Sequence, residues 1–152
     1  MRFAAEVGFR VVVVDRRPGY LTADRFPAAA ALVQSVGDEL EDALPLDAEC
    51  YAVVMNHNFA DDQAYVRALL KAPVAYVGML GPRQRTERIL RNLSAEGSTD
   101  EGRVYGPVGL DIGTDGAEQV ALAVIAEILA VRSGRRARSL RERRAAIHAP
   151  TD

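Results

Sequence analysis

Four short apolar runs divide the chain before residue 80, and a polar or glycine-rich segment follows each of them. The runs occupy residues 9–15, 32–36, 51–55 and 74–77 and are rich in valine. Apolar runs of this length, without strict alternation of polar and apolar residues, are typical of parallel strands that are buried on both faces. We therefore predict a β-strand at each run.

Segments with helical periodicity separate and follow these strands. We predict helices at residues 39–44, 61–71, 82–95 and 117–131, and the end of a helix at residues 1–7, which Gly8 terminates. Asp38 suits a helix cap, Pro82 suits a first helical position, and residues 78–81 read as a glycine-flanked turn. The last helix has little polar surface in its middle, so we expect it to pack into the core.

Strands that alternate with helices across short loops indicate an α/β fold in which helices cover both faces of a mostly parallel sheet, giving three layers. In such a sheet the functional residues collect at the carboxyl ends of the strands. The residues that the sequence places there are Asp15, Asn56, His57, Asn58, Gly78, Gly81 and Arg83.

A second candidate segment is the loop at residues 106–113, Gly-Pro-Val-Gly-Leu-Asp-Ile-Gly, directly before the last helix. Its glycines let the backbone approach a ligand or another backbone closely. Asp111 lies between two large apolar residues, and a carboxylate there is costly to bury without hydrogen bonds. Either Asp111 caps local amides in a structural turn, or it faces a polar ligand.

The side chain of His57 also has two alternatives. His57 can carry a proton or contact a ligand, or it can be a loop histidine hydrogen-bonded to Asp61 or Asp62. We predict no metal site, because no other histidine lies near His57 in sequence.

In the basic helix, Arg83 is well placed to bind an anion. We expect Arg85 and Arg88 to make solvent-facing pairs with Glu87 and its neighbours. No nucleophile with an adjacent base stands out.

Composition narrows the class of protein further. The 152 residues carry a net charge of -2, with 49% hydrophobic and 26% charged residues, as in an ordinary globular domain. The single cysteine and the lack of a long apolar run favour a cytoplasmic protein, with neither nucleic acid nor a membrane as its partner. Residues 132–144 contain seven arginines, so we divide the chain into a domain at residues 1–134 and a basic, flexible tail at residues 135–152.

The N-terminal segment matches the second half of a dinucleotide-binding unit. Such a unit has a strand, a glycine-rich turn, a helix, and a second strand that ends in an acid. Here a helix end, Gly8, a strand and Asp15 follow one another, without the first strand and its glycine turn. We therefore expect an N-terminally truncated sheet whose uncovered apolar flank favours a homodimer.

Five ordered blocks together resemble one family, the XdhC/CoxI xanthine dehydrogenase accessory proteins. The blocks are Val-Val-Val-Asp at 12–15, His-Asn-Phe at 57–59, Gly-Met-Leu-Gly-Pro-Arg-Gln-Arg-Thr-Glu-Arg at 78–88, the loop at 106–113, and Ala-Glu-Ile at 126–128. The resemblance covers nearly the whole chain and implies the family's C-terminal Rossmann-like domain.

The resemblance implies a helper in the maturation of molybdenum hydroxylases. Such a protein binds molybdenum cofactor, supports its sulfuration with a cysteine desulfurase, and delivers it to the apo-enzyme. The residues that would bind the cofactor here are Asp15, His57, Asn58, Gly78, Gly81, Arg83, Gly109, Asp111 and Gly113. The sequence lacks the family's separate cysteine-containing N-terminal domain, and Gly116-Ala117 replaces the usual Thr-Pro before the last helix.

Two other functions stay open. Asp15, with Arg16 and Arg17 beside it, could accept the ribose or 2′-phosphate of NAD(P) in an oxidoreductase. Alternatively, the chain is a non-catalytic fragment that only makes protein contacts.

Overall fold

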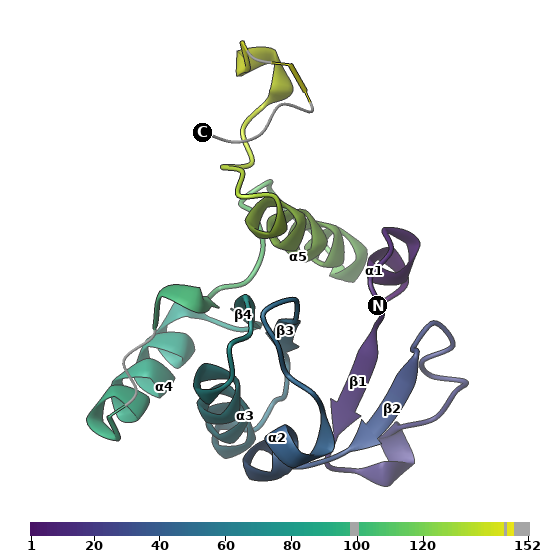
Figure 1. Ribbon diagram of the computed structural model, residues 1–152, viewed down its shortest axis with the longest axis vertical. Helices are drawn as coiled ribbons and strands as arrows, with labels where there is room; N and C mark the ends of the chain where they lie inside the picture. The colour runs from purple at the N-terminus through teal and green to yellow at the C-terminus, as the bar shows by residue number, and fades with distance from the viewer. Residues whose placement is uncertain (98–100, 145, 148–152) are drawn as a thin grey trace. The chain divides into compact units, whose positions relative to one another are not determined.

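The computed structural model describes residues 1–97, 101–144 and 146–147 (Figure 1). The chain forms two compact units, Met1–Val108 and Gly109–Asp152, which we call the N-terminal unit and the C-terminal unit. The N-terminal unit contains α1 (Arg2–Glu6), β1 (Val12–Asp15), η1 (Pro18–Tyr20), β2 (Ala31–Gln34), η2 (Gly37–Glu39), α2 (Leu40–Ala43), β3 (Tyr51–Val54), α3 (Phe59–Lys71), β4 (Tyr76–Met79), α4 (Arg83–Ala95), η3 (Glu101–Arg103) and β5 (Val104–Tyr105), where η denotes a 3-10 helix. The C-terminal unit contains α5 (Ala117–Arg132) and η4 (Leu140–Glu142).

All strand pairs of the N-terminal unit are parallel, as the fold class predicts. The strands β1 and β2 pair in one sheet, with Val13 opposite Leu32. A second sheet has the order β3-β4-β5, with Val53 opposite Gly78. In the part of the chain that is described, no strand pairs with the other edge of β1 or of β3.

Two details of the second sheet differ from the prediction. The fourth strand lies at Tyr76–Met79 rather than at residues 74–77, so Gly78 and Met79 are strand residues and not a turn. The strand β5 was not predicted, because it has only two residues. Its pairing partner Val77 makes it a strand, and a sequence window of that length carries no periodicity.

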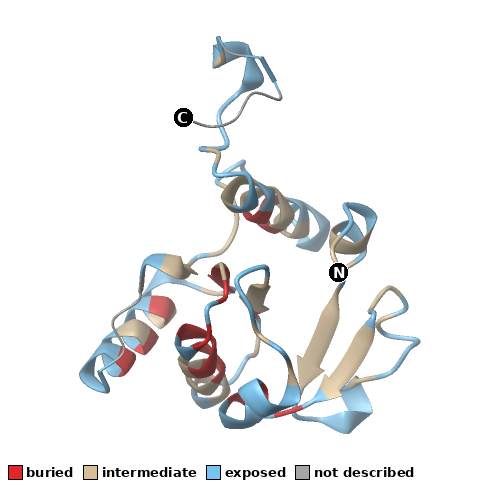
Figure 2. Ribbon diagram, viewed as in Figure 1, coloured by how far each residue is buried: buried red, intermediate tan, exposed pale blue. Residues whose placement is uncertain are grey.

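The hydrophobic core lies where α3 and α4 pack against β4, and Figure 2 shows that the buried residues gather on these elements. Tyr76, Met79, Ile89, Leu93 and Val66 are the largest apolar side chains with less than 2% exposure. The helix α3 begins two residues before the predicted start, because the side chain of Asn58 accepts hydrogen bonds from the amides of residues 60 and 61. The predicted cap Asp38 instead lies within η2.

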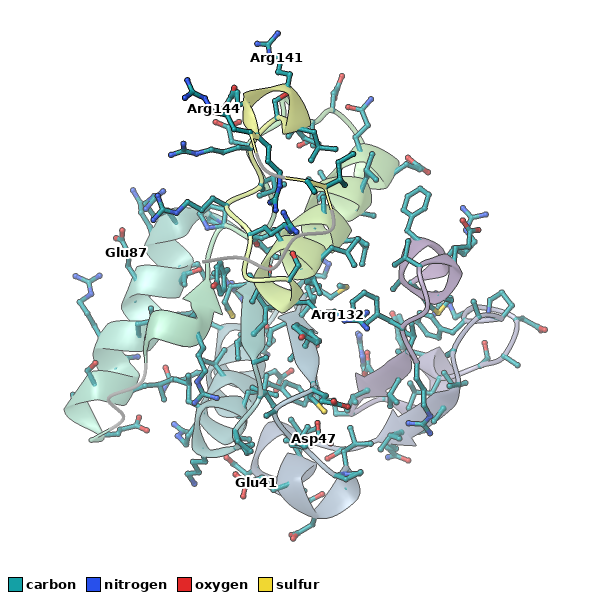
Figure 3. All side chains as sticks on the ribbon, turned by 45° about the horizontal axis from the view of Figure 1, so that its top comes forward. Glu41, Asp47, Glu87, Arg132, Arg141 and Arg144 are labelled. Carbon is teal, nitrogen blue, oxygen red and sulfur yellow. The ribbon has the colours of Figure 1, made fainter. Side chains whose placement is uncertain are left out.

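The C-terminal unit is more open than the apolar sequence of its helix predicts. In α5 the buried residues are Ala123, Val124 and Ile128, whereas Leu122 is 52% exposed and Leu129 is 36% exposed. The helix therefore buries one set of positions and exposes apolar side chains at others. Figure 3 shows Arg141 and Arg144 projecting outward from the segment after α5. The predicted tail also includes residues 145 and 148–152, which lie outside the described part.

A buried glycine fixes the packing of η2 on α3. A Cβ atom at Gly37 would lie 2.5 Å from the Tyr65 backbone nitrogen and 2.6 Å from the Ala64 Cβ atom. We expect Gly37→Ala to lower the free energy of unfolding by about 1–3 kcal/mol, because helix backbone cannot move aside locally. Urea denaturation measures this loss. Gly19→Ala is the matched control, since a Cβ atom there has nothing within 4 Å; an equal effect of both substitutions would contradict the packing argument.

Candidate functional site

The candidate site of the N-terminal unit lies at the carboxyl ends of its strands, where the fold class places functional residues. Two contacts join the strand ends. The Arg16 Nε atom, just after β1, lies 2.9 Å from an Asp61 carboxylate oxygen in α3, which follows β3. The hydroxyl of Tyr65 in α3 donates a hydrogen bond of 2.6 Å to the carbonyl oxygen of Ser35 after β2. The ends of β1, β2 and β3 are therefore held together through α3.

At the end of β1, both carboxylate oxygens of Asp15 accept hydrogen bonds from Arg17. The Arg17 guanidinium donates to both carboxylate oxygens, at 3.0 and 2.9 Å, and the Arg17 amide donates to one of them at 2.8 Å. These hydrogen bonds hold the pKa of Asp15 below its usual value. The same guanidinium lies 3.8 Å from the ring centroid of Tyr20, and Arg25 lies 4.5 Å from that centroid.

Of the three candidates after β3, Asn56 is half-buried, and the structure gives the other two different roles. Asn58 caps α3, so its side-chain oxygen is occupied by two backbone amides. His57 is exposed and makes no hydrogen bond within the described residues, so the predicted pairing with Asp61 or Asp62 is absent there. Those two carboxylates pair with arginines instead.

The shortest ion pair among the described residues of the unit was not predicted. Asp62 is fully buried, and its Oδ2 atom accepts hydrogen bonds from Arg85 Nε at 2.8 Å and Nη2 at 2.5 Å. Its Oδ1 atom has no partner in the described part of the chain. The expectation of solvent-facing pairs with Glu87 was wrong: Glu87 projects outward from α4 (Figure 3), and the guanidinium of Arg88 lies 4.8 Å from the Phe59 ring centroid. A sequence signal existed, since Asp62 lies on the apolar face of α3 together with Tyr65, Val66 and Leu69.

After β4, a loop leads to the exposed first turn of α4. Gly81 has φ of +139°, a conformation that favours glycine. Pro82 is the N-cap of α4 rather than its first residue, and its side chain makes no capping hydrogen bond. The first turn contains no acidic residue, and Arg83 is exposed without a partner among the described residues.

Gly78 is not part of this exposed edge. It is buried in β4, and a Cβ atom there would lie 2.6 Å from a methyl group of Val108 and 2.8 Å from the Tyr76 ring. Its small size therefore serves packing.

The remaining three candidates belong to the C-terminal unit. Gly109 and Gly113 both have positive φ, of 104° and 69°. The Gly109 amide donates to a carboxylate oxygen of Glu127 at 2.9 Å, so α5 holds the start of this loop. Asp111 is exposed and makes no hydrogen bond within the described residues, so it neither caps the loop nor requires a buried partner.

Comparison with known proteins identifies the family. The model of the XdhC Rossmann domain matches residues 1–128. The chain belongs to this family. The XdhC domain is 36% identical, over 85% of the chain, to a probable xanthine dehydrogenase subunit of Bacillus subtilis (strain 168). It is 31% identical, over 86% of the chain, to the uncharacterized protein YqeB of Escherichia coli (strain K12).

A solved structure supports the fold assignment. The crystal structure of a xanthine dehydrogenase from Bacillus halodurans superposes with a TM-score of 0.78 and 31% identity over 91% of the XdhC chain. The chain spans 38% and 24% of the two curated relatives and 40% of the crystallised chain. These matches show that the chain has a Rossmann-like α/β fold.

Membrane-spanning helices and clustered metal ligands are both absent from the described residues. None of the helices there is long and apolar enough to cross a membrane. Nor do three or more histidine, cysteine, aspartate or glutamate side chains converge there as metal ligands.

Removing Arg85 tests the importance of the buried pair. We expect Arg85→Met to lower the free energy of unfolding by roughly 3 kcal/mol, because the buried Asp62 charge loses its partner. The matched control Arg83→Met lies on the same turn without a partner among the described residues and should change stability by less than about 0.5 kcal/mol. Adding Asp62→Leu to Arg85→Met should recover most of the loss, since no unpaired charge remains. Equal denaturation midpoints for both single variants would overturn this assignment.

The titration of Asp15 tests the strand-end pair. We expect ¹³C NMR to give Asp15 a pKa below that of an ordinary aspartate, and Arg17→Gln to raise it towards the ordinary value. A lowered folded-state pKa means that Asp15 adds stability above its unfolded-state pKa, which is lost as the pH falls through the folded-state value. Arg25→Gln is the control, because Arg25 contacts Tyr20 and not Asp15. An ordinary Asp15 pKa in the unaltered protein would refute the pairing.

Proposed function

We propose that this XdhC domain is an accessory protein for the maturation of xanthine dehydrogenase-type molybdenum hydroxylases and that it binds molybdenum cofactor. Family membership and a relative named as a subunit of xanthine dehydrogenase support the first part of this proposal. Sulfuration of the cofactor with a cysteine desulfurase, and transfer to an apo-hydroxylase, are the further steps in which the domain would assist.

The observation that best supports cofactor binding is the positive charge at the N-terminus of α4. A helix N-terminus without a side-chain cap presents free backbone amides, and its dipole favours an anion. The first turn of α4 also carries the exposed Arg83, which has no partner among the described residues, and no acid. A phosphate group on a pterin is a dianion that can accept hydrogen bonds from the amides and from the guanidinium together.

The surrounding charges are compatible with an anion there. One acid at the α3–α4 contact, Asp62, is buried and paired with Arg85. The exposed imidazole of His57, at the neighbouring strand end, offers a polar group for the edge of a pterin. Asn58 has a capping role, so we assign the cofactor contact to His57 and Arg83. In the C-terminal unit, the exposed carboxylate of Asp111 is a separate candidate for the polar pterin edge.

NAD(P) binding is the competing function. Arg16 and Arg17 at the end of β1 could accept a 2′-phosphate, but the ribose-binding acid of such a site, Asp15, already has both oxygens bonded to Arg17. A ribose would have to displace that guanidinium. This occupied carboxylate is why we favour molybdenum cofactor.

An anaerobic binding titration tests the proposal. The purified chain is titrated with molybdenum cofactor, and in parallel with NADPH, following ligand fluorescence. We expect saturable binding of molybdenum cofactor that weakens about tenfold in Arg83→Gln, the loss of one charge-assisted hydrogen bond. Arg91→Gln alters an exposed residue further along the same helix, is the matched control, and should bind as the unaltered chain does. Asp111→Ala measures the contribution of the C-terminal unit.

Three outcomes would contradict the proposal. Binding that is equally affected by Arg83→Gln and Arg91→Gln would remove the helix N-terminus as the site. Preferential binding of NADPH, lost in Arg17→Gln, would favour the oxidoreductase. Failure of a folded chain to bind either ligand would favour a fragment that makes protein contacts alone.

A further inference from the structure

One side of the helix α5 carries apolar side chains that are exposed. Leu122 is 52% exposed and Leu129 is 36% exposed, and Ile125 between them is half-buried. Because these residues are three and four positions apart, they lie on the same side of the helix. Figure 2 shows both buried and exposed residues along α5. The exposed residues therefore form a continuous apolar surface on one side of α5.

The opposite side of α5 is covered by residues of its own unit. The Gly109 amide donates a hydrogen bond of 2.9 Å to the Glu127 carboxylate, and the Leu110 amide donates one of 3.3 Å to the Ala123 carbonyl oxygen. A Cβ atom at Gly109 would lie 3.3 Å from the Ala123 Cβ atom, so loop and helix are in close contact there. The loop that precedes α5 thus packs on the side of Ala123 and Glu127, away from Leu122 and Leu129.

The exposed side of α5 has opposite charges at its two ends. Glu118 lies in the first turn, four residues before Leu122, and Arg132 lies in the last turn, three residues after Leu129. Both charged residues are exposed. Positions 118, 122, 125, 129 and 132 are separated by four and three residues in alternation, the spacing of a helix side that packs against a second helix. We call these five residues the α5 stripe.

The α5 stripe is complementary to a second copy of itself that runs in the opposite direction. Ile125 is the midpoint of the stripe, seven residues from Glu118 and seven from Arg132. If two antiparallel helices cross at Ile125, Glu118 of each copy lies beside Arg132 of the other copy. The same crossing places Leu122 beside Leu129 of the second copy. A parallel pair would instead bring like charges together at both ends, and antiparallel helices also have opposed dipoles.

We propose that α5 forms the interface of a homodimer, in which the α5 stripes of two copies pack antiparallel about a two-fold axis at Ile125. The apolar centre stabilises the dimer, because Leu122 and Leu129 are removed from water. The charged ends select the antiparallel direction over the parallel one. This interface belongs to the C-terminal unit and differs from the apolar flank of the sheet, from which the sequence predicts a homodimer.

Sedimentation equilibrium of the full 152-residue chain tests the apolar centre of the interface. We expect Leu122→Gln to raise the dimer dissociation constant about tenfold or more, because each dimer loses two buried leucine side chains. Leu140→Gln is the matched control, since Leu140 is 59% exposed but lies in η4, outside the α5 stripe. This control should leave the dissociation constant unchanged. Circular dichroism checks that each variant is folded.

Exchanging the charges tests the antiparallel direction. At low ionic strength, Glu118→Arg and Arg132→Glu should each raise the dissociation constant about fivefold, because two attractions become two repulsions in each dimer. The double variant restores opposite charges at both ends and should recover most of this loss. In a parallel dimer each charge faces its own copy, so neither single substitution would weaken association.

A dimer that is weakened by Leu122→Gln and by each charge reversal, and recovered in the double variant, would support the proposal. A chain that stays monomeric up to about 200 µM would overturn it, since even small specific interfaces associate at such concentrations. A dimer that Leu122→Gln leaves intact, or that Leu140→Gln weakens equally, would place the interface elsewhere and overturn the proposal. A double variant as weak as the single ones would also overturn it. No cofactor takes part, so failure here is distinguishable from failure of the proposed function.

Discussion

The hydrogen-bonding requirement of parallel strands governs the arrangement of this domain. A parallel strand directs half of its backbone groups to each side, and an apolar strand with helices on its faces needs a neighbour at both edges. The strand β4 satisfies both requirements, since it lies between β3 and β5, and it is buried along its whole length. The core accordingly gathers around β4, α3 and α4, while β1 and β2 stay half-buried.

A second constraint is the buried carboxylate of Asp62. Because a charge without water needs a partner, the packing of α3 on α4 commits the Arg85 guanidinium to Asp62. The arginine two residues earlier, Arg83, then remains available at the first turn of the same helix. Of these two arginines of α4, Arg85 thus has a structural role, and Arg83 stays exposed.

The proposed cofactor binding relies on one part of the N-terminal unit. It uses side chains and amides after β3 and β4, namely His57, Arg83 and the start of α4.

The sequence by itself determined the class of each longer element and the family. Valine-rich runs favour strands, and five blocks in fixed order identified the XdhC domain, which the match to residues 1–128 confirms. It also located the end of β1 at Asp15 and the exposed Arg83, because those positions follow from local pattern. It failed for β5, which is too short to carry a pattern, and the apolar sequence of α5 does not reveal which side of that helix is covered.

Only the tertiary structure decided how the polar groups are paired. Arg17 occupies Asp15, Asn58 caps α3, and Arg85 reaches Asp62 across 23 positions of sequence. Charge pairing depends on which helix faces meet and on how far each side chain is removed from water. Hydrophobic periodicity indicates that a face is buried, but it does not indicate which residue of another helix will meet it.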